Sequence, residues 1–404
     1  MIYPLVALKD CCVVIGGATP KRNISEYWGN DIPWVTPKDV SNMSQPVLDD
    51  APEYISQAGY DSCSTYLLPK GAILLTSRAP IGNVAIAGHE MCTNQGFKSL
   101  IPGKDVDSRY LYHCIKNNAA KLQNLGNGAT FKEVSKKIVE AFEILLPPLK
   151  EQRRIAAILD KADAIRRKRQ RAIELTETFL RSVFLDMFGD PVMNPKRWKK
   201  KQLKYLVREG DTINYGVVQP GIDFPGGVPI VRVGDFKGGS IDKRNLKHID
   251  PEIENAYQRS RLTGDEILVA CVGSIGEVAL VNKTFEGFNI ARAVSRIRCS
   301  PEVNRIYLAL LLSTPAIKGY FISQTRVVAQ PTLNIKQIKE TEILLPPIEN
   351  QIKFVEIYNQ VKQKAAIEIE QRHRMGDIFR SLAQKAFKGE LTQSTTPLKE
   401  AISA

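Results

Sequence analysis

The sequence predicts an α+β protein in which one mixed α/β domain occurs twice, and each copy is followed by a long helix. Two observations indicate this fold class. The peptide EILLPPLKEQRRI, which begins at Glu143, returns as EILLPPIENQIKF at Glu342. After each copy, apolar residues recur every three or four positions for about forty residues, which is the period of an amphipathic helix. A repeat this long indicates a duplicated domain-plus-helix unit and not a solenoid.

Short strands and turns followed by a short helix are expected in the globular part of each unit. In the first unit the expected strands are Val13–Gly17, Ile73–Leu75, Val84–Ala87 and Ile144–Leu146, with a turn at 79–82 and a helix at Tyr110–Lys116. In the second unit they are Ile267–Ala270, Val278–Val281 and Ile343–Leu345, with a turn at Gly273–Gly276 and a helix at Ile306–Leu312. The peptide IPWV at Ile32 corresponds to VPIV at Val228, which supports the same repeat.

Each long helix has clear start and stop signals. The first follows Pro147-Pro148 and ends before Gly189-Asp190-Pro191, and the second follows Pro347 and ends at Gly389. Proline suits the first turn of a helix because no amide donor is needed there, whereas glycine suits its end. The apolar residues expected to join the two helices are Ile155, Leu159, Ala162, Ile165, Phe179, Val183, Ile352, Val355, Val361, Phe379 and Leu382.

Two apolar stripes of similar length within one chain favour a coiled coil between the two helices. The alternative is that each helix packs only on its own globular domain. The pattern does not fix the relative direction of the helices. An antiparallel pair would place the two globular regions at opposite ends.

Bulk properties point to a basic protein with folded cores. The formal net charge is +13 and 43% of the residues are hydrophobic, so the composition is not that of a disordered chain. A polyanion is the natural partner of such a chain, and nucleic acid is the first candidate, although a solvated basic surface has the same composition. No apolar run approaches the roughly 20 residues of a membrane span. The start of the sequence lacks a basic leader, and the seven scattered cysteines fit reduced thiols, so we expect a cytoplasmic protein without a membrane partner.

Basic and polar side chains near predicted turns are the candidate nucleic-acid-binding residues. Arg and Gln can form paired hydrogen bonds with base edges, while Lys and Arg neutralise phosphates. The candidates are Lys21, Lys38, Arg78, Gln95, Lys98 and Lys132 in the first unit, and Gln219, Arg232, Lys237, Arg292 and Gln330 in the second. Each one alone also suits an ordinary surface position, but two such sets in a basic chain predict a reader with two binding sites. A further basic segment, Arg166–Arg171, suits either a solvated helix face or contact with phosphate or a partner.

Motifs for catalysis are missing from the sequence. It contains no P-loop, no Asn/Asp-Pro-Pro-aromatic tetrapeptide of an amino-methyltransferase, and no Glu-x-Lys pair of a metal-dependent nuclease. The histidines His89, His113, His248 and His373 are isolated, and no Cys/His cluster has metal-ligand spacing. We therefore predict no catalytic residue, no metal site and no cofactor in this chain.

Several segments together resemble the specificity subunit of type I restriction-modification systems. They are IPWVTPKDV from Ile32, LLPKGAILLTSRAPIGNVAIAG from Leu67, TNQGFKSLIP from Thr93, EILLPPLKEQRRIAAILDKAD from Glu143, MFGDPVMNPKRW from Met187, NIARAVSRIR from Asn289 and LNIKQIKETEILLPPIENQ from Leu333. The resemblance covers nearly the whole chain. Its most specific signal is the Leu-Pro-Pro-Leu-x-Glu-Gln block at a strand-to-helix junction. In the second copy 348–351 reads IENQ where 149–152 reads LKEQ, a departure that leaves the assignment intact.

The resemblance implies two target-recognition domains, each of which reads one half of a split site in double-stranded DNA. It also implies that the two long helices form an antiparallel coiled coil that sets the spacer. The corresponding division is 1–148 for the first recognition domain, 149–188 for the central helix, 189–197 for a linker, 198–347 for the second recognition domain, 348–389 for the C-terminal helix and 390–404 for a tail.

The same resemblance implies a set of partner subunits. Two methyltransferase subunits would dock around the helices, and restriction subunits that translocate DNA would complete the enzyme. S-adenosylmethionine, ATP and Mg²⁺ would belong to those partners. This chain would dictate where adenine methylation and restriction occur without catalysing either reaction.

Two other functions stay open from the sequence. A self-contained nuclease or methyltransferase with divergent motifs would modify or cut DNA by itself with S-adenosylmethionine or Mg²⁺. A scaffold or RNA-binding coiled-coil protein would show no preference for a bipartite DNA site over random DNA or RNA. Within the specificity interpretation, the chain could also be an orphan or antirestriction-like subunit whose partners are missing.

Overall fold

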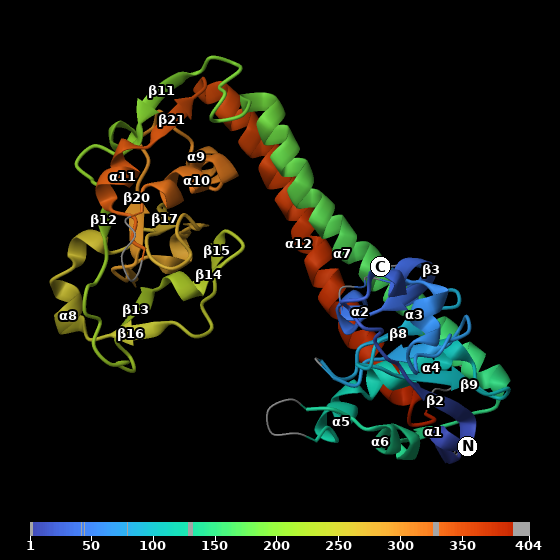
Figure 1. Ribbon diagram of the computed structural model, residues 1–404. Coiled ribbons are helices and arrows are strands. Elements are labelled where there is room, and N and C mark those ends of the chain that lie inside the picture. Colours follow the sequence, from blue (N-terminus) through green and yellow to red (C-terminus); the bar gives the residue numbers. More distant parts are fainter. Residues whose placement is uncertain are drawn as a thin grey trace. The chain divides into compact units, whose positions relative to one another are not determined.

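The fold of the chain is given by a computed structural model, which describes residues 3–41, 43, 45–78, 80–127, 132–325 and 331–390 (Figure 1). The chain forms two compact units. Unit 1 comprises Met1–Ile173 together with Ile367–Ala404, and unit 2 comprises Glu174–Ala366. Each unit therefore contains one globular domain and a part of both long helices.

The globular domain of unit 1 contains, among the described residues, a five-stranded sheet in the order β2-β9-β6-β7-β4. Its strands are Cys12–Gly16 (β2), Lys98–Pro102 (β9), Ile73–Leu75 (β6), Val84–Ala87 (β7) and Val47–Leu48 (β4). Neighbouring strands are antiparallel except β4, which runs parallel to β7. A second sheet has the order β5-β3-β8, with strands Glu53–Ile55, Trp28–Val35 and Cys92–Thr93.

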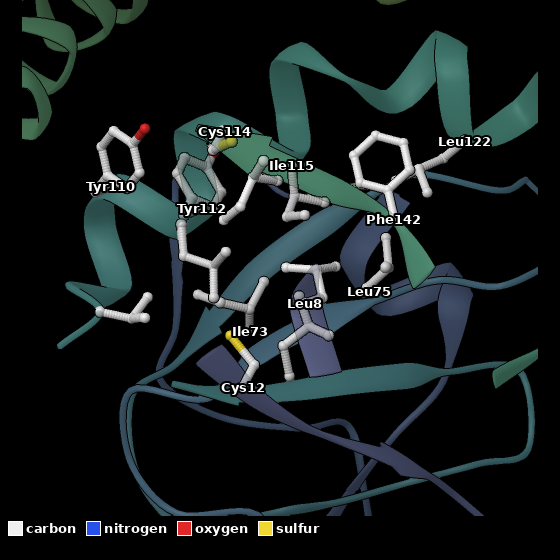
Figure 2. Close-up of a cluster of buried hydrophobic side chains, with 14 of the residues drawn as sticks. Leu8, Cys12, Ile73, Leu75, Tyr110, Tyr112, Cys114, Ile115, Leu122 and Phe142 are labelled. Atoms are coloured by element: carbon white, nitrogen blue, oxygen red, sulfur yellow. The ribbon is translucent and has the colours of Figure 1, made fainter. Parts of the chain in front are cut away.

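Helix α4 (Ser108–Asn117) covers the five-stranded sheet. It begins at Asp107, whose carboxylate accepts hydrogen bonds from two backbone N–H groups of the first turn. Figure 2 shows Tyr112 and Ile115 of α4 in one cluster with Ile73 of β6 and Cys12 of β2. The shorter helices of this domain are α1 (Leu8–Cys11), α2 (Pro37–Ser41), α3 (Gln57–Asp61), α5 (Ala119–Asn124) and α6 (Lys136–Ala141).

The globular domain of unit 2 is built in the same way. A sheet in the order β12-β20-β17-β18 contains Asn214–Tyr215, Val294–Ile297, Ile267–Ala270 and Val278–Leu280, all antiparallel. A second sheet, β16-β13-β19, contains Lys247–Ile249, Val228–Val231 and Asn289–Ile290. A hairpin joins β14 (Phe236–Lys237) to β15 (Ser240–Ile241). The helices are α8 (Pro251–Asn255), α9 (Arg305–Leu312), α10 (Pro315–Ser323) and α11 (Ile335–Glu340).

The order of strands confirms the predicted duplication of a mixed α/β domain. In unit 1, β3 lies between an antiparallel β5 and a parallel β8. In unit 2, β13 lies between an antiparallel β16 and a parallel β19. In both units a closing antiparallel pair leads into a long helix: β1 (Leu5–Ala7) with β10 (Glu143–Leu145), and β11 (Lys199–Gln202) with β21 (Glu342–Leu345).

The two long helices are α7 (Leu149–Phe188) and α12 (Ile348–Ala386). In unit 1, Leu159 of α7 belongs to the same core cluster as Leu382 of α12. Ten residues further along α7, Arg169 forms an ion pair at 2.9 Å with Glu368. Glu368 lies earlier in α12 than Leu382. Residue numbers therefore rise along one helix as they fall along the other, so the pair is antiparallel.

In unit 2, the end of α7 packs on the start of α12. The ring of Phe354 lies 5.4 Å from that of Phe184 and 5.5 Å from that of Phe188, measured between centroids. Phe184 also stacks on Tyr307 of α9. The helices therefore contact each other and the core of the domain at the same time, which combines the two packing modes that the sequence left open.

The apolar stripe differs from the prediction at two positions. Phe179 and Ile352 were expected between the helices but are 51% and 45% exposed. The adjacent Leu180 is buried instead in α7, and Phe354 is buried in α12. One residue turns the helix face by about 100° and two residues by about 200°, because the helix has 3.6 residues per turn, so Phe354, two positions after Ile352, lies on nearly the opposite face. Of the other predicted residues, Ile155, Leu159, Ala162 and Leu382 are buried, and Ile165, Val183, Val355, Val361 and Phe379 are half-buried.

Candidate nucleic-acid interface

In unit 1, backbone hydrogen bonds join the loops that carry the candidate residues. The N–H of Ala18, after β2, donates to the Thr93 carbonyl at 3.0 Å, and the N–H of Asn94 donates to the carbonyl of Val35 at 3.0 Å. The N–H of Ser77, after β6, donates to the carbonyl of Gly96 at 2.8 Å. The end of β8 and the turn that follows it, residues 93–97, are therefore held by the loops after β2 and β6 and by the end of β3.

Glycine at position 17 allows two of these loops to approach closely. A Cβ atom built on Gly17 would lie 2.2 Å from the carbonyl oxygen of Thr93. In unit 2, a Cβ on Gly216 would lie 1.7 Å from the carbonyl oxygen of Ile290. No side chain fits at either position, so both units need glycine at the same contact.

Gln95 lies at the exposed tip of the turn between β8 and β9. Its Oε1 accepts a hydrogen bond from the Thr19 hydroxyl, which orients the amide. Arg78 is half-buried and directly follows Ser77, one of the residues that hold this turn. The structure therefore brings Gln95 and Arg78 into the same group of loops.

The lysines of unit 1 lie on different elements, Lys38 in α2 and Lys98 at the start of β9, and they are in two different states. Lys21, Lys38 and Lys132 are exposed. Lys98 is only 15% exposed and forms an ion pair with Glu133 at 3.2 Å. Because a carboxylate already neutralises Lys98, the three exposed lysines are better placed to contact an external anion.

In unit 2 the same backbone contacts recur. The N–H of Val217 donates to the Ile290 carbonyl at 2.7 Å, and the N–H of Ala291 donates to the Val231 carbonyl at 3.0 Å. Arg292 is exposed, and its own N–H donates to the Val217 carbonyl at 2.8 Å. Gln219 is exposed and lies two residues beyond Val217 on the facing loop.

The other three candidates of unit 2 differ in their surroundings from Gln219 and Arg292. Arg232 is adjacent to Val231, but its guanidinium donates to the Asp235 carboxylate at 3.1 Å and to the Asn245 carbonyl at 3.0 Å. Lys237 is exposed on the β14–β15 hairpin. Gln330 lies outside the described residues, so its place in the site stays a prediction.

The basic segment Arg166–Arg171 is largely engaged in contacts within unit 1. Its ion pairs are Arg166–Asp163 at 2.8 Å, Arg167–Asp163 at 3.3 Å and Arg169–Glu368 at 2.9 Å. Lys168 and Arg171 are exposed. Of these ion pairs, that of Arg169 joins α7 to α12, whereas the two with Asp163 lie within α7, and Arg166 is exposed as well.

Gln152, to which the sequence analysis gave no role, is fully buried where the first domain meets α7. Its Oε1 accepts a hydrogen bond from the N–H of Asp107 at 2.8 Å. Its Nε2 donates to the carbonyls of Asp105 and Pro147 at 2.9 and 2.7 Å. One amide thus ties the start of α7 to the cap of α4.

Gln351 makes the same connection in unit 2. It is fully buried, its Oε1 accepts from the N–H of Asn304 at 2.7 Å, and its Nε2 donates to the Pro346 carbonyl at 2.8 Å. Nearby, Tyr110 and Tyr307 donate to the carbonyls of Leu145 and Leu344 at 2.6 and 2.8 Å. Burial raises the pKa of both tyrosines above the usual range, so both remain protonated donors.

A family model described as the type I restriction modification DNA specificity domain matches residues 4–177 and 195–375. The chain belongs to this family. The two matched segments correspond to the two copies of the domain, each with a large part of the helix that follows it. The family that the sequence motifs predicted is thereby confirmed.

Known specificity subunits are similar to this chain over most of its length. It is 30% identical over 403 residues to the type I restriction enzyme MjaIX specificity subunit of Methanocaldococcus jannaschii, which covers 95% of this chain and 92% of that protein. It is 29% identical over 316 residues to the EcoBI specificity subunit of Escherichia coli, which covers 71% and 66% of the two proteins.

Solved structures of type I systems have the same fold as this specificity chain. The type I restriction-modification S subunit from M. genitalium superposes with a TM-score of 0.57 at 14% identity, covering 95% of this chain and 96% of that one. A chain from a study of complex assembly and conformational transition of a type I system gives 0.58 at 18% identity, covering 96% and 98%. At these identities the likeness supports the fold alone.

Two further findings concern sites of other kinds. Within the described ranges, no group of three or more His, Cys, Asp or Glu side chains is arranged to hold a metal ion in this specificity chain. No single helix of the described part is long and apolar enough to cross a membrane. The bent pair α9 and α10 reaches the required length and composition only when the two helices are taken together across a 60° bend.

Proposed function

We propose that this chain is the non-catalytic DNA specificity subunit of a type I restriction-modification enzyme. Each globular domain binds one half of a bipartite site in double-stranded DNA. The observation that carries the proposal is the duplicated loop contact, in which Gly17 and Gly216 let a loop pack against the turn that presents Gln95 or Arg292. Two equivalent surfaces in one basic chain suit two half-sites.

The proposed contacts with DNA divide by chemistry. Exposed lysines such as Lys21, Lys38 and Lys132 neutralise phosphates, which provides affinity and a steep dependence on salt. Arg and Gln side chains on the loop tips contact base edges, which provides specificity. Lys98 and Arg232 contribute less to either because each is already paired with a carboxylate.

The helix pair is proposed to set the spacer between the half-sites and to dock two methyltransferase subunits. Exposed apolar side chains on the helices, Leu175, Phe179 and Ile352, support docking because they have no place in the cores. Restriction subunits would complete the enzyme in the cytoplasm. S-adenosylmethionine, ATP and Mg²⁺ are assigned to those partner subunits.

Co-expression with the methyltransferase subunit of the same system tests this function. Genome-wide mapping of methylated adenine is expected to give one split motif, with two specific halves around an unread spacer. The chain purified alone is expected neither to methylate DNA with S-adenosylmethionine nor to cut it with Mg²⁺. A contiguous motif, no methylation by an assembled complex, or activity of the chain alone would contradict the proposal.

A further inference from the structure

One position of the duplicated domain is occupied by Gln95 in unit 1 and by Arg292 in unit 2. Two backbone hydrogen bonds flank it in each unit. In unit 1 the preceding residue, Asn94, donates to the carbonyl of Val35, and the following residue, Gly96, accepts from Ser77 at 2.8 Å. In unit 2 the corresponding bonds are Ala291 to Val231 at 3.0 Å and Cys271 to Ala293 at 2.7 Å.

A third contact fixes the equivalence of the two positions. The loop that follows β2 in unit 1 donates from Ala18 to the carbonyl two residues before Gln95, at 3.0 Å. In unit 2, Val217 donates to the carbonyl of Ile290, two residues before Arg292, at 2.7 Å. The backbone is thus held on both sides of this position, while its side chain is exposed in both units. A rigid backbone with an exposed tip is what recognition of a base edge needs.

The surroundings of the two side chains match two different hydrogen-bonding patterns. The amide of Gln95 is oriented by the Thr19 hydroxyl, which donates to Oε1 and leaves the second lone pair and both Nε2 protons available. The residue equivalent to Thr19 is Val218, which has no hydroxyl and is 47% exposed. In the part of unit 2 that the structure describes, the neighbouring Arg296 and Arg298 pair with Asp211, whereas Arg292 is exposed and forms no ion pair.

We propose that this position reads a base in each half-site, with Gln95 recognising an adenine and Arg292 a guanine. The assignment rests on the proposed function, that both domains bind DNA. An amide offers one donor and one acceptor, which match N7 and the N6 amino group of adenine in the major groove. A guanidinium offers two donors, which match O6 and N7 of guanine. Val218 and Thr19 then flank the reading side chain in their respective units.

Exchanging the two residues provides the test. Gln95→Arg and Arg292→Gln are each co-expressed with the methyltransferase subunit, and methylated motifs are mapped across the genome. Gln95→Arg is expected to change one adenine to guanine in one half of the motif, leaving the other half and the spacer as they were. Arg292→Gln is expected to change one guanine to adenine in the other half. Relative methylation of the two versions should shift by about ten- to a hundredfold, the range for one paired base contact.

Matched variants separate base reading from other effects. Gln57→Arg, at an exposed glutamine of α3, and Arg244→Gln, at an exposed arginine paired with Asp242, are expected to leave the motif unchanged. If Gln95→Arg or Arg292→Gln impairs folding, the variants Gln95→Ala and Arg292→Ala test the assignment instead. Each should relax discrimination at one base pair of the methylated motif only. Thr19→Val should relax the same base pair as Gln95→Ala, since Thr19 positions the amide.

Failure of the base assignment and failure of the function give different results. A wild-type split motif that keeps the same bases in all four variants of Gln95 and Arg292 would overturn the assignment alone. Weaker methylation with unaltered base preference would also overturn it, because a phosphate contact behaves in that way. A wild-type complex that methylates no split motif would overturn the proposed function itself.

Discussion

At the scale of single residues, the buried amides Gln152 and Gln351 illustrate why a domain and the helix that follows it behave as one piece. A glutamine side chain both donates and accepts, so it can satisfy the N–H at the cap of one helix and the carbonyl before another. Both residues are fully buried. The peptide block that repeats in the sequence is therefore a structural joint, and its preservation within the chain follows from hydrogen bonding.

Removing either amide should loosen its own joint. Gln152→Ala is expected to lower the free energy of unfolding of unit 1 by about 1–3 kcal/mol, because buried polar groups lose their partners. Gln351→Ala should do the same in unit 2. Hydrogen exchange measures each effect locally: the amide of Asp107 should exchange faster in the first variant and that of Asn304 in the second.

The exposed Gln57 gives the control for this pair of variants, because its amide bonds to Asp61 on the surface. Gln57→Ala should leave exchange at Asp107 and Asn304 as in the wild type. If the backbone N–H of Asp107 exchanged as slowly in Gln152→Ala as in Gln57→Ala, the side chain of Gln152 would not hold the joint.

Single residues also explain why composition overstates the cationic surface. Lys98 and Arg232 were equal candidates with Lys21 and Lys38 in the sequence, but Glu133 and Asp235 neutralise the first two. Three of the arginines in the segment Arg166–Arg171 are paired in the same way. Ion pairing thus selects a smaller set of side chains for contact with an external anion.

At the scale of elements, a polar layer interrupts the apolar contact between α7 and α12. Arg169 donates to Glu368 and Gln371, and Arg372 donates to Gln170. The side chain of Arg169 is 20% exposed, so its charge depends on these partners. A polar pair within an apolar seam disfavours other registers, because a shifted register would leave the charge without a partner.

Removing one partner of the pair between Arg169 and Glu368 should lower the free energy of unfolding more than replacing both partners with apolar residues. Glu368→Ala is expected to lower the free energy of unfolding of unit 1 by about 1 kcal/mol, because Arg169 stays in place without its carboxylate. Arg169→Met combined with Glu368→Leu should regain that loss. A double-mutant cycle from chemical denaturation measures the coupling between the two residues.

The neighbouring Glu370 serves as the control for Glu368, because it is exposed on the same helix. Glu370→Ala should change stability by less than about 0.5 kcal/mol, as surface substitutions usually do. Equal effects of Glu368→Ala and Glu370→Ala would mean that the polar layer contributes nothing to the pairing.

At the scale of the whole molecule, the chain contains two related domains and two helices of 40 and 39 residues that are shared between the units. The proposed function gives the helices the role of a spacer. Such a role makes the unread stretch of the DNA site depend on helix length, while the bases that are read depend only on the loops.

Shortening both helices should therefore shorten the spacer. Removing seven residues from the middle of each helix preserves the apolar stripe almost in register, because seven residues are close to two turns. The loss of roughly 10 Å corresponds to about three base pairs. Genome-wide methylation mapping should then give the same two half-sites with a spacer shorter by about that number.

A deletion from α7 alone is the matched control, because it places the stripes of the two helices out of step and should reduce methylation without defining a new spacer. An unchanged spacer in a folded, active complex with both helices shortened would show that other parts of the assembly set the spacing.

The sequence by itself determined the duplication, the two long helices and the family. These features are readable because a long internal repeat and a period of 3.6 residues are local patterns in the chain. The same reading placed Phe179 and Ile352 between the helices, where Leu180 and Phe354 are buried instead. Local periodicity located the apolar face only to within one residue in α7 and two residues in α12, and each residue turns the face by roughly 100° around the helix.

The apolar stripes left the direction of the helices open, and the family resemblance implied an antiparallel pair, which the ion pair between Arg169 and Glu368 and the shared cluster of Leu159 and Leu382 confirm. Only the tertiary structure decided two other matters: which cations are neutralised by carboxylates, and the equivalence of Gln95 with Arg292. The partners of Arg169 and Lys98 lie 199 and 35 residues away along the chain. Gln95 and Arg292 share no side-chain chemistry, and only the backbone hydrogen bonds around them identify one position. Contacts through space between distant residues leave no pattern in a single sequence, so the fold was needed to reveal them.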